Sequence, residues 1–190
     1  MPLRVHNDPG HAHFLTFSCF HRRQFLTDTR LCAWLAWSID KARIVHDFDL
    51  WAYVFMPEHV HMLIHPRLEA YSISAILRDI KHPVARSLVA HLEKHDPSRL
   101  RRMKARQGRR EVHRLWQAGG GYDRNLYQED AVARAITYIE WNPVTRGLVS
   151  APCGWEWSSA RARAGETTVF LAIDALAFDF EIMRRVLGRP

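Results

Sequence analysis

The chain has 190 residues, of which 47% are hydrophobic and 25% are charged, a composition typical of a folded globular domain rather than of a disordered chain. Lys and Arg outnumber Asp and Glu by 27 to 20, and this excess predicts a polyanionic partner, most commonly nucleic acid. There is no apolar run that could span a membrane or act as a signal peptide, and no CxxC pair among Cys19, Cys32 and Cys153, so we expect a soluble cytoplasmic protein without membrane partner, disulfide framework or cysteine zinc site.

The chain is expected to begin with a strand and a helix. Residues 13–20 are rich in aromatic and β-forming residues and predict a strand, and two adjacent arginines, Arg22 and Arg23, follow it. Residues 27–48 predict a helix, because apolar side chains recur there at helical spacing after a choice of capping residues.

Two further strands, 49–56 and 59–65, are separated by only two residues and therefore predict an antiparallel hairpin. Side chains alternate along a strand, so His59, His61 and His65 share one face while the apolar residues between them face a core. Two imidazoles on one strand face can bind a metal ion if other segments supply more ligands. Solvated surface histidines are the alternative interpretation.

A second helix is expected over residues 71–95, where Pro83 must kink or split it. An inserted basic arm, 98–115, follows, and eight of the sixteen residues 99–114 are Lys or Arg. We expect this arm to be exposed and to bind the phosphates of a nucleic acid through Arg101, Arg102, Arg109 and Arg110. The arginine pair at 22–23 is expected to form a second contact with the phosphates. A solvated charged loop is the alternative.

A glycine-rich turn at 118–121 separates the arm from a short strand and from a helix over residues 129–142, which Pro143 should end. Trp116 and Tyr122 flank this turn and are candidate aromatic platforms for bases. Tyr138 and Asn142 lie four residues apart and so share one helix face. Taken singly, they also suit an amphipathic edge and a helix end.

This order of elements predicts an α+β fold, in which an antiparallel sheet has helices packed on one face and leaves the other face free for ligands. We expect one domain over residues 1–165, with the basic arm inserted, and a C-terminal helical tail over residues 166–190, in which residues 169–187 are helical or mixed and carry no evident chemistry.

Taken together, the motifs resemble the single-tyrosine HUH transposases and, within them, the REP-associated tyrosine transposases. The matching strings are "YVFMPEHVHMLI", "LWQAGGGYDRNLYQEDAVARAITYIEWNPVTRGLV" and "WEWSSA", in this order. The resemblance implies a ferredoxin-like HUH nuclease fold and a nuclease that cleaves and rejoins single-stranded DNA at REP hairpins. It also implies that Tyr138 is the nucleophile and that His59, His61 and Asn142 bind Mg²⁺ or Mn²⁺. A monomer is favoured, and a homodimer is the alternative.

The implied chemistry is consistent with the residue types. A phenol has an ordinary pKa of about 10 and is a weak nucleophile at neutral pH, so a divalent ion that polarises the scissile phosphate would assist it. A phosphotyrosine intermediate conserves the bond energy, which agrees with the absence of GxxxxGK[ST] and GxGxxG motifs and of an expected nucleotide cofactor.

Two other functions are compatible with parts of the sequence. A non-catalytic, hairpin-DNA-binding regulator derived from a transposase would bind DNA without forming an adduct. A zinc hydrolase would use the HxH pair with a further His, Asp or Glu. Tyr122 and Tyr127 are rival nucleophiles, but neither precedes an Asn on a helix.

Overall fold

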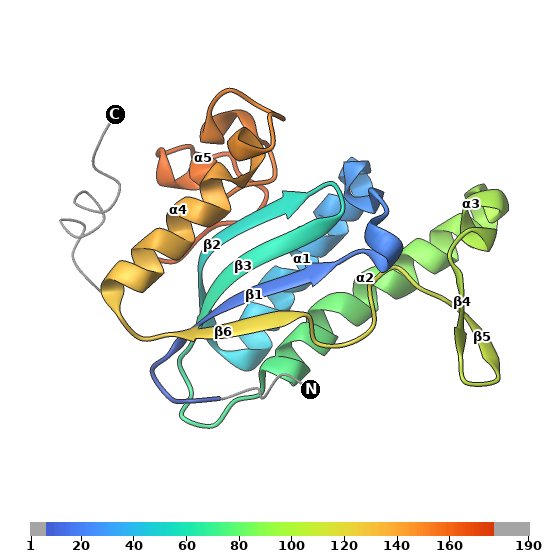
Figure 1. Ribbon diagram of the computed structural model, residues 1–190, viewed down its shortest axis with the longest axis horizontal. Coiled ribbons are helices and arrows are strands. Elements are labelled where there is room, and N and C mark those ends of the chain that lie inside the picture. Colours follow the sequence, from blue (N-terminus) through green and yellow to red (C-terminus); the bar gives the residue numbers. More distant parts are fainter. Residues whose placement is uncertain (1–6, 177–190) are drawn as a thin grey trace.

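A four-stranded antiparallel sheet in the order β2–β3–β1–β6 forms the centre of the computed structural model, which describes residues 7–176 (Figure 1). Its strands are β1 (Ala12–Ser18), β2 (Phe48–Met56), β3 (His59–Pro66) and β6 (Tyr122–Leu126). The predicted hairpin between β2 and β3 is confirmed, since the two strands pair antiparallel with Met56 opposite His59. The α+β class is likewise confirmed.

Two long helices, α1 (Thr29–His46) and α2 (Ile73–His95), cover one face of the sheet. Val60, Met62 and Ile64 of β3 point into the core between this face and the helices. The helix α4 (Glu129–Thr145) lies on the opposite face. The face that was predicted to be free is therefore partly covered by α4, whose apolar stripe, together with the sheet residues below it, comprises Ala52, Val54, Leu63, Val132, Ile136 and Ile139.

Pro83 does not split α2, which runs from Ile73 to His95 with the proline inside it, so a kink is the predicted alternative that remains. A proline has no N–H, so the carbonyl of Asp79, four residues earlier, loses its helical partner. The hydroxyl of Ser38, on α1, lies 3.3 Å from the carbonyl oxygen of Asp79 and 2.8 Å from that of Ile80. This tertiary hydrogen bond compensates for the missing donor within the helix pair.

Pro143 also lies inside its helix, which continues to Thr145, so the prediction that it ends α4 is wrong. Only the last turn is affected, and the backbone N–H of Arg146 still bonds the carbonyl of Asn142 at 3.1 Å. The extra turn brings Thr145 and Arg146 beside the residues before the proline.

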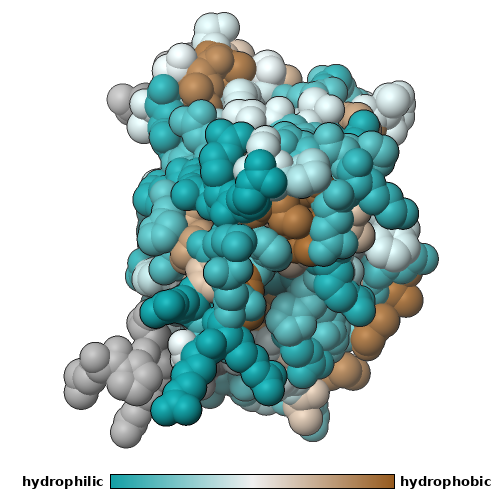
Figure 2. Space-filling model, turned by 90° about the vertical axis from the view of Figure 1, so that its right-hand side faces the viewer, coloured by the Kyte–Doolittle hydropathy of each residue, from teal (hydrophilic) through white to brown (hydrophobic). Residues whose placement is uncertain are grey.

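The basic arm folds into a short helix α3 (Pro97–Arg101) and a two-stranded hairpin of β4 (Lys104–Gln107) and β5 (Arg110–His113). The buried side chains of Leu100 and Met103 anchor it to the core. The hairpin projects at the far right of Figure 1. Figure 2, which views the molecule from that side, shows hydrophilic residues over most of the face.

Short elements complete the described chain: the 3-10 turns η1 (Phe20–Arg22), η2 (Phe25–Thr27) and η3 (Pro152–Gly154), and the helix α5 (Ala160–Arg163). None of the described helices is both long and apolar enough to cross a membrane.

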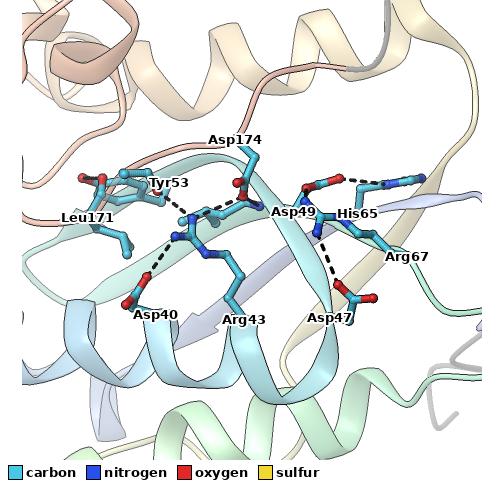
Figure 3. Close-up of polar contacts among 11 residues, drawn as sticks. Asp40, Arg43, Asp47, Asp49, Tyr53, His65, Arg67, Leu171 and Asp174 are labelled. Carbon is cyan, nitrogen blue, oxygen red and sulfur yellow. Dashed lines mark hydrogen bonds and ion pairs between the residues drawn. The ribbon is translucent and has the colours of Figure 1, made fainter.

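The described part of the C-terminal segment, residues 164–176, contains no helix, and residues 177–190, which hold most of the predicted helical tail, lie outside the described part. The segment runs beside β2, where Tyr53 donates to the Leu171 carbonyl at 3.1 Å (Figure 3). Asp174 accepts from the backbone N–H of Leu50 at 2.8 Å and pairs with Arg43 of α1 at 3.2 Å.

Ser38→Ala should lower the free energy of unfolding by about 1 to 3 kcal/mol, because it leaves the buried carbonyls before Pro83 without their side-chain donor. Pro83→Ala supplies the backbone donor that Ser38 replaces, so the cost of Ser38→Ala should shrink in that background. Denaturant unfolding of the two single variants and the double variant measures this coupling. An equal cost in both backgrounds would contradict the assigned role of Ser38.

Candidate active site

A cavity of about 470 Å³ opens on the α4 side of the sheet, above β1 and β3. Residues from β1, the η1 turn, β3 and α4 line it, and they include all four residues that the sequence assigned to catalysis and metal binding. The lining is Thr16, Arg22, His59, His61, Thr137, Tyr138, Trp141, Asn142, Thr145 and Arg146.

The histidine pair forms the floor of this cavity. The Nε2 atoms of His59 and His61 lie 3.0 Å apart, and both side chains are buried. The Nδ1 of His59 donates to the Glu58 carboxylate at 3.1 Å, since a carboxylate can only accept. The Nε2 lone pair of neutral His59 therefore faces His61.

Burial keeps both imidazoles neutral. It lowers the pKa of His59, and it lowers the pKa of His61 to about 3, with further contributions from neighbouring His59 and Arg22. The Nδ1 of His61 lies 2.7 Å from the hydroxyl of Thr16, which can either donate or accept. His61 can therefore present Nε2 as an N–H donor to His59 or as a free lone pair to a metal ion.

The donor set fits a divalent ion. An octahedral ion with ligands at about 2.1 Å requires adjacent ligand atoms about 3.0 Å apart, which matches the spacing of the two imidazole nitrogens. The Oδ1 atom of Asn142 is buried in the lining without a hydrogen-bond partner among the described residues, and amide oxygens suit Mg²⁺ and Mn²⁺. Within residues 7–176, no group of three His, Cys, Asp or Glu residues could hold a metal ion, although the zinc hydrolase alternative requires such a third ligand.

The helix α4 presents Tyr138 and Asn142 to this cavity from one face, as their spacing predicts. The side chain of Tyr138 is 54% exposed, and its ring stands edge-on to His61 with the centroids 5.4 Å apart. Of the rival tyrosines, Tyr122 lies on β6 beside Phe14, and Tyr127 lies against His11. Neither rival lines the cavity.

Sequence reasoning missed Glu58, which organises the rim of the cavity. Its side chain is only 5% exposed, and one carboxylate oxygen accepts from His59, from Arg22 at 2.9 Å and from Arg146. Burial opposes ionisation of Glu58, but hydrogen bonds and charges from Arg146 and His59 still hold its pKa below the usual value. The sequence signal for Glu58 was its position directly before the HxH motif. The sequence signal for Arg146 was its position one helical turn after Asn142.

The predicted DNA-binding residues occupy different environments. Arg22 lines the cavity, and Arg23 donates to the Arg102 carbonyl, which ties the η1 turn to the arm. Tyr122 is exposed on β6, close to Phe14. The arm residues Arg101, Arg102, Arg109 and Arg110 are exposed.

Trp116 does not suit its predicted role as a platform for bases. It is buried, its ring packs edge-on against Phe17, and its indole N–H donates to the Lys81 carbonyl at 3.0 Å. The aromatic side chain is therefore part of the core, where α2 and β1 meet the segment before β6.

No known family model matches the chain, and no curated protein matches it in sequence. Among solved structures, a REP-associated tyrosine transposase bound to a REP hairpin aligns with a TM-score of 0.67 at 21% identity, over 94% of this chain and 95% of that one. A second structure, of a candidate transposase from Deinococcus radiodurans R1, aligns with a TM-score of 0.43 at 20% identity, over 72% of this chain and 95% of that one. The chain therefore has the fold of a REP-associated tyrosine transposase.

Proposed function

We propose that the protein is a metal-dependent transposase of the REP-associated tyrosine type, which cleaves and rejoins single-stranded DNA at palindromic hairpins through a covalent phosphotyrosine. The observation that carries this proposal is the shared cavity: an exposed tyrosine, two convergent neutral imidazoles and an unpartnered amide oxygen line one hollow. The similar structure that holds a REP hairpin supports the choice of substrate.

In this mechanism, the hydroxyl oxygen of Tyr138 attacks the scissile phosphorus and forms the new P–O bond. The bond from phosphorus to the 3′ oxygen breaks, and that oxygen takes a proton from solvent to become a free 3′ hydroxyl, which balances the proton that the Tyr138 hydroxyl gives up to solvent. The 5′ phosphate remains on Tyr138. A second 3′ hydroxyl rejoins the DNA by the reverse attack, with no external energy source.

The remaining groups bind and orient the phosphate. Mg²⁺ or Mn²⁺, held by His59, His61 and Asn142, would supply charge stabilisation and polarise the phosphate when bound. Arg22 and Arg146 at the rim can donate hydrogen bonds to the non-bridging oxygens, because guanidinium groups match phosphate geometry. All of these groups come from one chain, so we propose that a monomer is competent.

Tyr138→Phe should reduce the covalent protein–DNA adduct on denaturing gels to background, because the variant lacks the attacking oxygen. Binding of a hairpin oligonucleotide should stay within about twofold, since the ring and its contacts remain. Tyr127→Phe, at an exposed tyrosine outside the cavity, is the matched control and should form the adduct at the wild-type rate. Undiminished adduct in Tyr138→Phe would reject the assignment and direct attention to Tyr122, whereas no adduct from wild type on any hairpin would favour a non-catalytic regulator.

His61→Ala and Asn142→Ala should each weaken Mn²⁺ binding at least tenfold in calorimetry, because each removes one proposed ligand. His65→Ala is the matched control: His65 lies on the same strand but stacks on Trp51 with the ring centroids 4.7 Å apart. Equal Mn²⁺ affinity in wild type and His61→Ala would place the metal site elsewhere. A wild-type preference for Zn²⁺ would instead favour the hydrolase alternative.

Replacing Arg101, Arg102, Arg109 and Arg110 by Gln should weaken binding of all DNA sequences alike. Each phosphate of single-stranded DNA that the variant no longer neutralises should reduce the slope of log affinity against log salt by about 0.7. A salt titration measures this slope. Lys41 and Arg86 are exposed on α1 and α2, outside the arm, and serve as the control pair. Replacing both of them should therefore flatten the slope less than replacing Arg109 and Arg110. An unchanged slope in the four-arginine variant would identify the arm as a solvated charged hairpin.

A further inference from the structure

A second cavity, of about 260 Å³, lies on the other side of Tyr138, between α4 and the edge of the sheet formed by β6. Among the described residues, Tyr138 alone lines both cavities. The lining of the second cavity is Phe14, Arg124, Leu126, Ala131, Arg134, Ala135 and Tyr138.

One face of α4 runs through both cavities. The helix positions in the second cavity are 131, 134, 135 and 138, and those in the first include 138, 141, 142 and 145. Spacings of three and four residues place all of these side chains on a continuous stripe. A ligand that follows this stripe must therefore pass Tyr138.

The two cavities differ in chemistry. The first is lined by imidazole, amide, hydroxyl and guanidinium groups, which suit a phosphate and a metal ion. The wall of the second is apolar, because Leu126 and the small side chains of Ala131 and Ala135 leave open space beside the ring of Phe14. Arg124 and Arg134 are both exposed at its border and supply positive charge.

A flat apolar group attached to an anion matches this second cavity. Nucleobases stack on aromatic rings and on guanidinium planes, while their phosphates pair with arginine. Each nucleotide of a single strand offers this combination, whereas few other ligands expected for a basic DNA-binding protein do. The space beside Phe14 thus complements one base, and the arginines complement the adjoining backbone.

We propose that this second cavity, the base pocket, binds the nucleobase of a nucleotide that flanks the phosphate attacked by Tyr138. The proposal rests on the proposed function for the place of the scissile phosphate. Phe14 links the two cavities, because its ring stacks on His61 at 5.4 Å and meets Tyr138 edge-on at 5.9 Å. A base seated on Phe14 therefore sets the position of the strand relative to the tyrosine hydroxyl.

The test fills the base pocket and measures binding, independently of catalysis. Ala135→Leu adds three carbon atoms to its wall. The probes are a twelve-nucleotide oligothymidylate and an abasic strand of equal length and charge. The ratio of the affinity for the oligothymidylate to the affinity for the abasic strand isolates the contribution of the bases. In Ala135→Leu, the loss of one stacked base should lower this ratio by about tenfold relative to wild type. Affinity for the abasic strand should not change, because the arginines remain.

Ala90→Leu is the matched control, because it makes the same change at an exposed alanine of α2, on the face of the sheet opposite to α4. It should keep the wild-type ratio. Arg134→Gln is a second variant at an exposed position, and it should lower the affinity for both probes and also the ratio, because the guanidinium at the border of the pocket stacks on the base. Thermal unfolding confirms that each variant is folded, and Arg134→Gln decides the outcome if Ala135→Leu does not fold.

An unchanged ratio in the folded pocket variant would overturn the proposal, as would an equal loss of affinity for both probes in Ala135→Leu. A lowered ratio in a protein whose wild type forms no phosphotyrosine adduct would support the base pocket and reject the proposed transesterase. If the phosphotyrosine adduct forms normally but Ala135→Leu leaves the ratio unchanged, the result would support the proposed transesterase and reject the base pocket.

Discussion

The pairing of β3 between β2 and β1 is the constraint on which the rest of the site depends. In this register, Val60, Met62 and Ile64 enter the core, and the same alternation directs His59 and His61 to the α4 side. A slip by one residue would bury the imidazoles against α1 and α2 and expose the apolar side chains. The packing free energy of the core therefore also fixes the side of the sheet to which the His59 and His61 side chains point.

The helix α4 supplies the second half of the site in the same way. Its apolar side chains pack on the sheet, which turns the stripe that contains Tyr138 and Asn142 toward the histidines. The helix rises only about 1.5 Å per residue, so the same stripe continues beyond the cavity toward the N-terminus of α4, where Ala131, Arg134 and Ala135 line the second cavity. One docked helix can thus present the proposed nucleophile, the proposed metal ligand and the wall of the proposed base pocket to a single extended ligand.

Electrostatics prepares this surface for an anion. Glu58 is a buried carboxylate that accepts hydrogen bonds from His59 and from two arginines at the rim. Breaking such an arrangement by removing one partner is costly, because the other charges would remain without compensation. The arginines are consequently held in place before the proposed DNA substrate binds, while the arm extends the positive surface away from the site.

The sequence by itself determined the features that depend on local periodicity. Alternation along β3 and the four-residue spacing of Tyr138 and Asn142 are properties of a strand and a helix, so the shared faces followed once the elements were recognised. The α+β class followed from the order of those elements. Only the tertiary structure decided the features that depend on partners distant in sequence. Ser38 satisfies the helix around Pro83, Glu58 gathers Arg22 and Arg146, and the Trp116 ring is buried against Phe17. No local pattern encodes these contacts, because each arises where two separate segments are brought together by the packing of the whole core.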